Sequence, residues 1–122
     1  KQEGSTIVTV GSDLGVRPIP ERIGYCPSKA GVIMLTKCIA LEFAPHIRAN
    51  AILPGLVRTP MIEQRFTEAE DPAALEESYA SLYPLHKMGK IEDMANAIAF
   101  LSSDESGFIT GEIMQVCGGS LI

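Results

Sequence analysis

The segment Thr6-Ile7-Val8-Thr9-Val10-Gly11-Ser12 decides the fold class of this chain. Its first five residues are all β-branched, which is typical of a strand buried in a parallel sheet. Ser12 ends the run, so we expect its hydroxyl to point out of the carboxyl end of the strand. Open α/β sheets bind their ligands at that end.

A helix and a second strand are expected after this segment. A loop rich in Gly and Pro, residues 13–20, leads to a helix predicted over 27–44, with Pro27 in its first turn. A short strand over 49–53 follows and ends at Pro54-Gly55. Two strands joined through a helix form a right-handed parallel unit, so the predicted fold class is α/β.

Tyr25 and Lys29 stand four residues apart where this helix begins. That spacing places the phenol and the ammonium on one face of a helix, within reach of a shared site. A cation close to a phenol favours its ionised form and makes it a better proton donor and acceptor near neutral pH. Together with Ser12, the pair indicates carbonyl or alcohol redox chemistry.

The ordered set of motifs resembles the short-chain dehydrogenase/reductase family. Its members carry a Ser, a Tyr and a Lys that match Ser12, Tyr25 and Lys29 in order and spacing. The matching segments are Gly4 to Ser12, Tyr25 to Gly31, Asn50 to Gly55, Thr59-Pro60-Met61, Met88 to Asp93, Ile109-Thr110-Gly111 and Gly118-Gly119. Together they are far more specific than a lone Tyr-x-x-x-Lys, which recurs by chance on ordinary helices.

The resemblance implies a partial Rossmann-like, doubly wound parallel sheet that corresponds to the carboxyl-terminal half of the family's domain. Residues 1–122 would form a single part of that oxidoreductase domain. Neither Gly-x-x-x-Gly-x-Gly nor Gly-x-Gly-x-x-Gly, the pattern of a phosphate-binding loop, occurs in the sequence. We expect that loop to lie upstream of Lys1.

The resemblance also implies the chemistry and the site. Hydride would pass between NAD or NADP and a small-molecule carbonyl or secondary alcohol, with a 3-oxoacyl thioester as one candidate. Tyr25 would transfer the proton, Ser12 would hydrogen-bond the substrate oxygen, and Lys29 would assist Tyr25 and hold the cofactor ribose. The expected cofactor contacts are Tyr25, Lys29, Pro54, Gly55, Val57 and Thr59. For Thr59, the alternative is a helix cap.

Residues 61–84 are the expected substrate lid. The composition of this segment turns to Glu, Gln, Arg and Ala without a strong core pattern. Asp71 and Pro72 predict the start of a helix. One face of that helix carries an apolar stripe formed by Leu75, Tyr79 and Leu82. The stripe would close over an apolar substrate, or it would rest on the core as an ordinary amphipathic helix.

Two further elements complete the predicted fold. A helix is expected over 92–101, because acidic residues occupy its first turn and apolar residues recur at helical spacing. Its inward residues are expected to be Met94, Ala95, Ile98 and Leu101. A last strand is expected over 112–116.

The helix over 27–44 has two apolar sides. One side carries Ala30, Met34, Cys38 and Leu41, and the other carries Val32, Leu35, Ile39 and Phe43. A sheet covers only one side of a helix, so the second side is expected to pack against a neighbouring helix or subunit. The resemblance implies a homo-dimer or tetramer formed through this helix.

The composition of the chain argues against nucleic acids, membranes and metal ions as partners. The net charge is −5 without a cluster of Lys and Arg, so no nucleic-acid partner is expected. No apolar stretch reaches the ~18 residues that span a bilayer, and Lys1 to Ser5 lack a signal-peptide core. We therefore expect no membrane association and a cytoplasmic protein. Cys26, Cys38 and Cys117 are too widely spaced for a metal site or a disulfide framework, and Cys26 is interpreted as a packing residue.

The competing hypothesis is an inactive fragment or a non-catalytic interaction module derived from such an enzyme. A sheet of three strands would have an open edge and uncovered apolar faces, which favour association. The chain alone is therefore expected to lack tight cofactor binding and turnover. It would associate with an amino-terminal half or with copies of itself.

Overall fold

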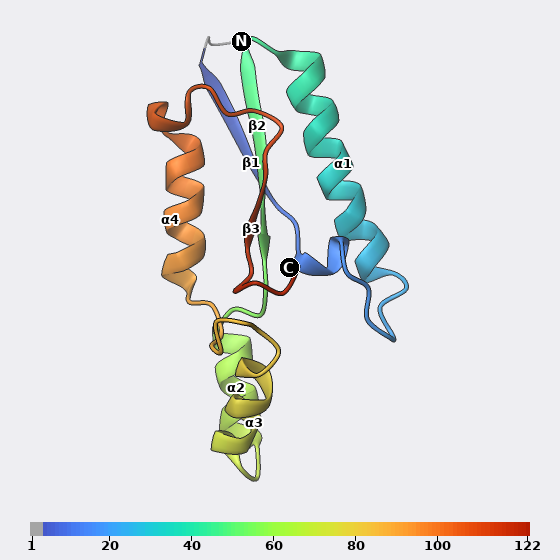
Figure 1. Ribbon diagram of the computed structural model, residues 1–122, viewed down its shortest axis with the longest axis vertical. Coiled ribbons are helices and arrows are strands. Elements are labelled where there is room, and N and C mark those ends of the chain that lie inside the picture. Colours follow the sequence, from blue (N-terminus) through green and yellow to red (C-terminus); the bar gives the residue numbers. More distant parts are fainter. Residues whose placement is uncertain (1–3) are drawn as a thin grey trace.

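The computed structural model describes residues 4–122 as a three-stranded parallel sheet with helices on both faces (Figure 1). The strands are β1 (Ser5–Val10), β2 (Ile47–Pro54) and β3 (Ile113–Val116), in the order β1-β2-β3. This architecture confirms the predicted α/β class. Lys1, Gln2 and Glu3, the start of the expected domain, lie outside the described residues.

The central strand β2 forms the core of the sheet. Its residues Ala49, Ala51, Ile52 and Leu53 are at most 1% exposed, because neighbouring strands and helices surround them. Val10 pairs with Ile52, and Pro54 pairs with Val116. The parallel register therefore brings the carboxyl ends of all three strands to one edge of the sheet.

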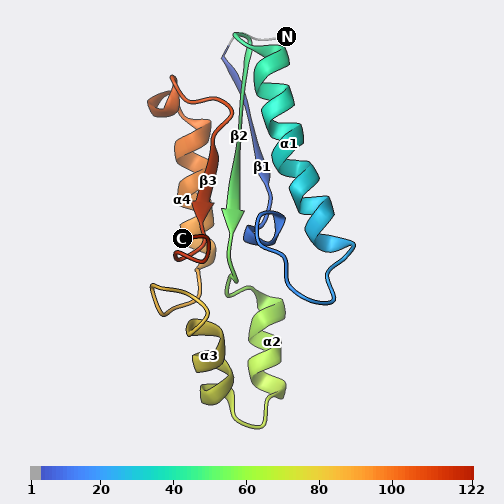
Figure 2. The same ribbon diagram turned by 45° about the vertical axis from the view of Figure 1, so that its right-hand side comes forward.

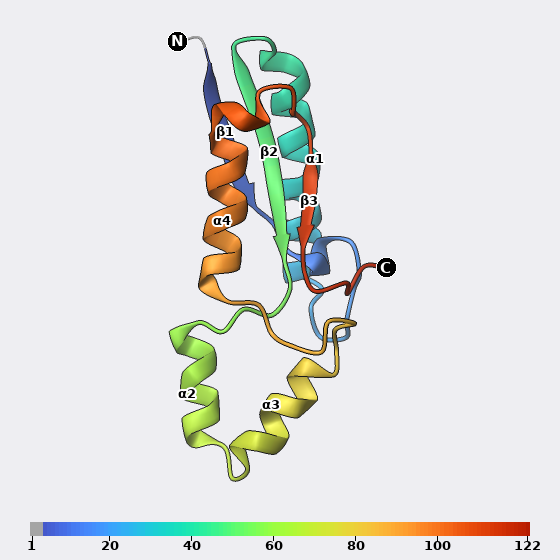
Figure 3. The same ribbon diagram turned by 60° about the vertical axis from the view of Figure 1, so that its left-hand side comes forward.

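Helices α1 (Tyr25–Phe43) and α4 (Ile91–Ser102) lie on opposite faces of the sheet (Figures 1 and 3). The crossover from β1 to β2 carries α1, and the crossover from β2 to β3 carries α4. Both crossovers move in the same direction across the sheet but pass over opposite faces, so they have opposite hands. The general preference for right-handed crossovers would place both helices on the same face. Two short 3₁₀ turns, η1 (Asp13–Gly15) and η2 (Asp104–Ser106), follow β1 and α4.

The inward face of α4 differs by one residue from the prediction. Met94 and Ile98 are half-buried and Leu101 is fully buried, as expected. Ala95 is exposed, and Ala97 is half-buried in its place. Ala97 shares a helix face with Met94, Ile98 and Leu101, whereas Ala95 lies at the edge of that face, because an α-helix turns once in 3.6 residues.

The sheet-facing side of α1 matches the predicted pattern only in part, since Val32 and Ile39 of the second apolar side are half-buried. Thr36 and Ala40 are buried there, whereas Met34, Leu35 and Leu41 are 59%, 55% and 85% exposed. The hydroxyl of Thr36 donates to the carbonyl of Val32 at 2.7 Å and lies 2.6 Å from the hydroxyl of Thr9. Small and hydrogen-bonded side chains therefore let α1 approach the sheet, and the larger apolar residues face outward.

Two further helices, α2 (Pro60–Glu68) and α3 (Pro72–Ala80), project beyond the carboxyl ends of the strands (Figure 2). Between them, Ile62, Phe66 and Met88 form a buried apolar cluster. The prediction that this segment has no strong core pattern was therefore wrong. The missed signal is the cap Thr59, the Pro at the first helical position, and Ile62 and Phe66 one turn apart.

The predicted stripe on α3 is divided between core and surface. Leu75 and Tyr79 pack against the buried cluster, and the Tyr79 ring lies 5.9 Å from that of Phe66. Leu82 is 60% exposed. Leu75 and Tyr79 therefore rest on the core, as the interpretation of α3 as an ordinary amphipathic helix predicted.

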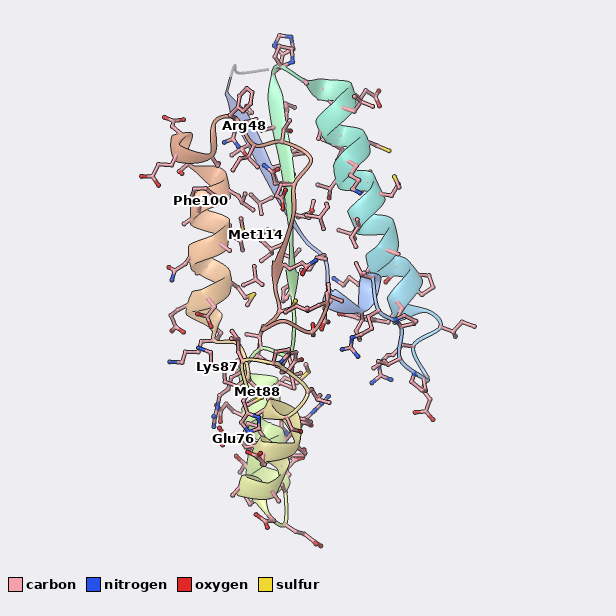
Figure 4. The ribbon with its side chains drawn as sticks, viewed as in Figure 1. Arg48, Glu76, Lys87, Met88, Phe100 and Met114 are labelled. Atoms are coloured by element: carbon pink, nitrogen blue, oxygen red, sulfur yellow. The ribbon has the colours of Figure 1, made fainter. Side chains whose placement is uncertain are left out.

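Arg48 lies at the end of the sheet away from α2 and α3, where α4 ends (Figure 4). Its guanidinium donates to four backbone carbonyls at 2.9 to 3.4 Å, those of Leu101, Ser103, Ser106 and Ile109. The carbonyls at a helix end lack partners within the helix. A cation at that position satisfies them and interacts favourably with the helix dipole.

Two expected absences concern residues 4–122 only. Within that range, no helix has both the length and the apolar character needed to cross a bilayer. The same residues include no group of three or more His, Cys, Asp or Glu that could hold a metal ion. The three cysteines are free, with Cys26 and Cys117 buried and Cys38 exposed.

Candidate functional site

Ser12 lies immediately beyond the carboxyl end of β1, where it begins the turn η1. Its backbone is extended (φ −162°), and its side-chain oxygen accepts a hydrogen bond from the N–H of Leu14 at 3.1 Å. The hydroxyl also donates to a carboxylate oxygen of Asp13 at 3.3 Å. Ser12 is 7% exposed, so these contacts fix the hydroxyl in one place.

Tyr25 and Lys29 meet at the start of α1. The Nζ atom of Lys29 lies 5.8 Å from the centroid of the Tyr25 ring, within the range of a cation–π contact. The same Nζ donates a hydrogen bond to the carbonyl of Val10 at 3.3 Å. Lys29 therefore reaches from the helix to the end of β1, while Tyr25 is 44% exposed and faces solvent.

The turn that carries Ser12 packs directly against α1. A Cβ atom added to Gly15 would lie 2.9 Å from the carbonyl carbon of Lys29 and 3.0 Å from the nitrogen of Ala30. Only glycine permits so close an approach of the two backbones. The structure therefore holds the serine turn beside the Tyr25/Lys29 turn.

The three proposed catalytic residues are close but not fully connected. Within residues 4–122, no hydrogen bond joins Ser12 to Tyr25. Instead, Lys29 bonds to Val10 and Ser12 bonds to Leu14 and Asp13. Catalytic hydrogen bonds are often incomplete without substrate, so the missing bond is compatible with the predicted site.

The segment after β2 turns toward α2 at the same edge of the sheet. Val57 forms a parallel bridge with Gly89, in which the N–H of Arg58 donates to Gly89 at 2.9 Å and the N–H of Gly89 donates to Leu56 at 3.0 Å. Because neighbouring residues of an extended segment alternate in direction, the N–H of Val57 points away from that bridge. The hydroxyl of Thr59 accepts from the N–H of Ile62 at 3.4 Å. Thr59 is thus a helix cap, the alternative expected from the sequence.

Tyr83 was not anticipated from the sequence. Its hydroxyl accepts a hydrogen bond from the N–H of Leu56 at 2.7 Å. A Cβ atom added to Gly55 would lie 2.9 Å from the Tyr83 ring, so this ring packs directly against Gly55. Burial raises the pKa of Tyr83, and the carboxylate of Asp13 adds to the rise.

An apolar groove lies beside the proposed catalytic turn. It has a volume of about 460 Å³ and runs between the loop after η1 and the first turns of α1. Its apolar lining includes Leu14, Val16, Ile19, Ile23 and Cys26. The burial of Cys26 agrees with its interpretation as a packing residue.

Comparisons with known proteins agree with this geometry. A family model described as enoyl-(acyl carrier protein) reductase matches residues 1–120. The 3-oxoacyl-[acyl-carrier-protein] reductase FabG of Thermotoga maritima is 42% identical over 100% of this chain and 48% of its own length. The 7alpha-hydroxysteroid dehydrogenase of Clostridium sardiniense is 39% identical over 98% of this chain and 44% of its own length. The chain thus spans about half the length of the relatives that it matches.

Solved structures give the same result. The structure of ElxO with NADP bound superposes with a TM-score of 0.88 at 36% identity, over 95% of this chain and 46% of that one. Aldohexose dehydrogenase of Thermoplasma acidophilum superposes with a TM-score of 0.84 at 33% identity, over 98% of this chain and 49% of that one. The three-stranded sheet is therefore similar to part of the larger Rossmann-fold sheets of these proteins.

Proposed function

We propose, from the premise that this chain belongs to the short-chain dehydrogenase/reductase family, that it supplies the reaction site of an NAD(P)-dependent oxidoreductase. The reaction transfers hydride between the cofactor and a carbonyl or secondary alcohol of a small molecule. The observation that carries this proposal is the position of Lys29. Its Nζ lies against the Tyr25 ring and at the end of the serine strand simultaneously.

Each side chain has one part in the chemistry. Tyr25 gives or takes the proton of the substrate oxygen, because its hydroxyl is exposed beside a fixed cation. Ser12 contacts the same oxygen and stabilises it as its charge changes. Lys29 places a positive charge beside the Tyr25 ring. A bound nicotinamide would supply the hydride chemistry.

The described residues fit the nicotinamide half of such a cofactor. Lys29 and Tyr25 would hold its ribose, and Pro54, Gly55 and the outward-pointing N–H of Val57 would line the ring and its carboxamide. The Thr59 hydroxyl accepts from Ile62, so its own proton is free of that bond and would donate to the carboxamide. NAD and NADP share this half, so the proposal covers both.

The substrate proposal is an apolar carbonyl or alcohol compound, with a 3-oxoacyl thioester as one class. The apolar groove lined by Leu14 of the serine turn and by Cys26, the chain neighbour of Tyr25, supports an apolar substrate. The relatives named as 3-oxoacyl and hydroxysteroid enzymes act on largely apolar molecules by their names. Residues 61–84, which include α2 and α3 beyond the carboxyl ends of the strands, would serve as the lid.

The protein would assemble as a homo-dimer or tetramer through α1. Its outward face carries Met34, Leu35 and Leu41, all more than half exposed. An exposed apolar face of this kind favours an interface. The relatives are named as dehydrogenases and reductases, so the comparisons do not favour the alternative of a non-catalytic module.

The test uses a longer polypeptide, in which this chain is extended upstream to a complete cofactor-binding sheet. Oxidation of a panel of secondary alcohols is measured with NAD and with NADP, for the unmodified protein and for Tyr25→Phe. Loss of the phenol is expected to lower turnover by at least about 100-fold, the size of a general acid–base contribution. Cofactor binding, measured by calorimetry, is expected to persist.

Tyr79→Phe is the matched control, because the ring of Tyr79 packs on Phe66 away from the site. Turnover that is unchanged in Tyr25→Phe would overturn the mechanism, and so would cofactor binding without turnover on any substrate of the panel.

A further inference from the structure

Asp13 is a charged residue in an unusually buried place. It follows Ser12 in η1 and is only 5% exposed. Carboxylates are seldom buried to this extent unless they are paired and hydrogen-bonded. Arg17 supplies part of the compensation, since its guanidinium lies 3.6 Å from a carboxylate oxygen of Asp13.

The two carboxylate oxygens of Asp13 have different partners. Oδ1 accepts from the hydroxyl of Ser12 at 3.3 Å. Oδ2 accepts from the hydroxyl of Ser120 at 2.8 Å, although 107 positions separate the two residues. One buried carboxylate therefore joins the serine turn to the carboxyl-terminal turn, residues 117–122.

The carboxyl-terminal turn is in contact with the base of the lid as well. The carbonyl of Gly118 accepts from the N–H of Leu85 at 3.1 Å. A Cβ atom added to Gly119 would lie 2.9 Å from the ring of Pro84. Ser12, Asp13, Ser120, Gly118 and Leu85 thus form a continuous path from the proposed catalytic serine to the segment that follows α3.

We propose that Asp13 is a positioning residue that holds the hydroxyl of Ser12 in place until a substrate oxygen takes over its single proton, and that also holds the carboxyl-terminal turn against the serine turn. This inference rests on the proposed function in one respect, that Ser12 contacts the substrate oxygen. Asn at position 13 would offer one neutral acceptor oxygen in place of two charged ones, so it would hold both turns more weakly, because hydrogen bonds to charged groups are about twice as strong as neutral ones.

The test compares four variants of the longer polypeptide: Asp13→Asn, Ser120→Ala, Ser120→Thr and the double variant Asp13→Asn/Ser120→Ala. Asp104→Asn and Ser102→Ala serve as controls, since both residues are exposed on or next to α4. Two quantities are measured for each variant: hydrogen exchange of the amides of residues 117–122 and Leu85, and kcat and KM separately.

Faster exchange in Asp13→Asn and Ser120→Ala, with native-like exchange in Ser120→Thr, is the expected result. We expect kcat to fall by roughly ten-fold in the first two variants, the size that a hydrogen bond to a charged group supports, with KM changed less. The double variant is expected to be less impaired than the sum of the two single variants, because both changes act on the same bond.

Two results would overturn the inference. Unchanged exchange in both single variants would mean that the bond does not hold the turn, whatever the activity. Faster exchange with unchanged kcat and KM would mean that Asp13 ties the chain together without orienting Ser12. Unchanged turnover in Tyr25→Phe would instead contradict the proposed function. The hydrogen-exchange experiment would still decide whether Asp13 holds the carboxyl-terminal turn.

Discussion

The Nζ atom of Lys29 donates a hydrogen bond to the backbone carbonyl of Val10 at 3.3 Å, so the start of α1 is anchored to the end of β1. The bond crosses from α1 to the sheet and directs the ammonium toward Ser12's turn. It also holds the charge beside the Tyr25 ring, 5.8 Å from the centroid. The cation is therefore positioned by the fold before any ligand binds.

This anchoring predicts that Lys29→Met is severely impaired in turnover. Methionine keeps the length of the apolar stem but has no charge and no donor for the Val10 carbonyl. We expect turnover of the longer polypeptide to fall by at least about 100-fold, comparable with the loss of an electrostatic stabiliser at an active site. Steady-state kinetics measure this, with Lys37→Met on the exposed side of α1 as the control. Equal losses in both variants would contradict a specific role for Lys29.

The contact between Tyr83 and Leu56 predicts a loss of stability in Tyr83→Phe. The variant removes the acceptor of the Leu56 N–H, now bonded at 2.7 Å, and keeps the packing of the ring on Gly55. An unpaired buried donor of this kind costs about 1–2 kcal/mol of unfolding free energy. Urea denaturation of Tyr83→Phe and of Tyr79→Phe measures the difference. An equal, small effect in both would show that the bond contributes little.

Tyr83 also predicts a dependence of stability on alkaline pH. Burial raises its pKa in the folded state above the ordinary value of 10.0, so the unfolded chain loses the phenol proton first. Stability from this group is complete below pH about 10 and is lost as the pH rises through the folded pKa. The unfolding free energy of the unmodified protein should therefore fall more steeply above pH about 10 than that of Tyr83→Phe. Parallel slopes in denaturation series would refute the prediction.

Local sequence patterns predicted the strands, α1 and α4, because each depends on residues that are neighbours in the chain. The β-branched run before Ser12 and the Tyr25/Lys29 spacing are examples of such patterns. The start of α1 came two residues early, at Tyr25, which is within the ordinary uncertainty of a helix boundary.

Contacts between distant segments could not be predicted in this way. Asp13 bonds to Ser120, and Arg48 bonds to carbonyls more than 50 positions away. Neither residue stands in a pattern that reveals its partner, since a buried charge and a surface charge look alike in sequence. The sheet-facing side of α1 was incompletely predicted for a related reason. Thr36 is polar and was not expected to be buried, but Thr9 and the carbonyl of Val32 satisfy its hydroxyl.

Arg48 predicts the largest stability effect outside the proposed site. Arg48→Met removes a charged donor from four carbonyls, although Ser106 and Asn50 still donate to some of them, and we expect a loss of about 2 kcal/mol of unfolding free energy. Arg48→Lys should recover less than half of this, because an ammonium lacks the planar fork that reaches several carbonyls at once. Arg65→Met, on the exposed surface of α2, is the control. Full recovery by Lys in denaturant titrations would show that charge alone is sufficient.

The outward face of α1 predicts how the protein assembles. Leu41 is 85% exposed and Leu35 is 55% exposed, on the side of the helix away from the sheet. If copies of the protein associate through this face, a charge placed there must be desolvated on association, which is costly without a partner. Leu41→Glu and Leu35→Glu are therefore expected to shift the longer polypeptide toward monomer in sedimentation velocity experiments.

Leu82→Glu provides the comparison, because Leu82 is 60% exposed but lies next to α3, far along the chain from α1. It should leave the sedimentation coefficient unchanged. A monomeric unmodified protein would contradict the proposed assembly, and an oligomer that survives both α1 substitutions would place the interface elsewhere. Far-ultraviolet circular dichroism of each variant separates dissociation from unfolding. Because Leu41 is exposed, the folded subunit should tolerate the charge that Leu41→Glu introduces. Loss of assembly with native helix content is therefore the expected result.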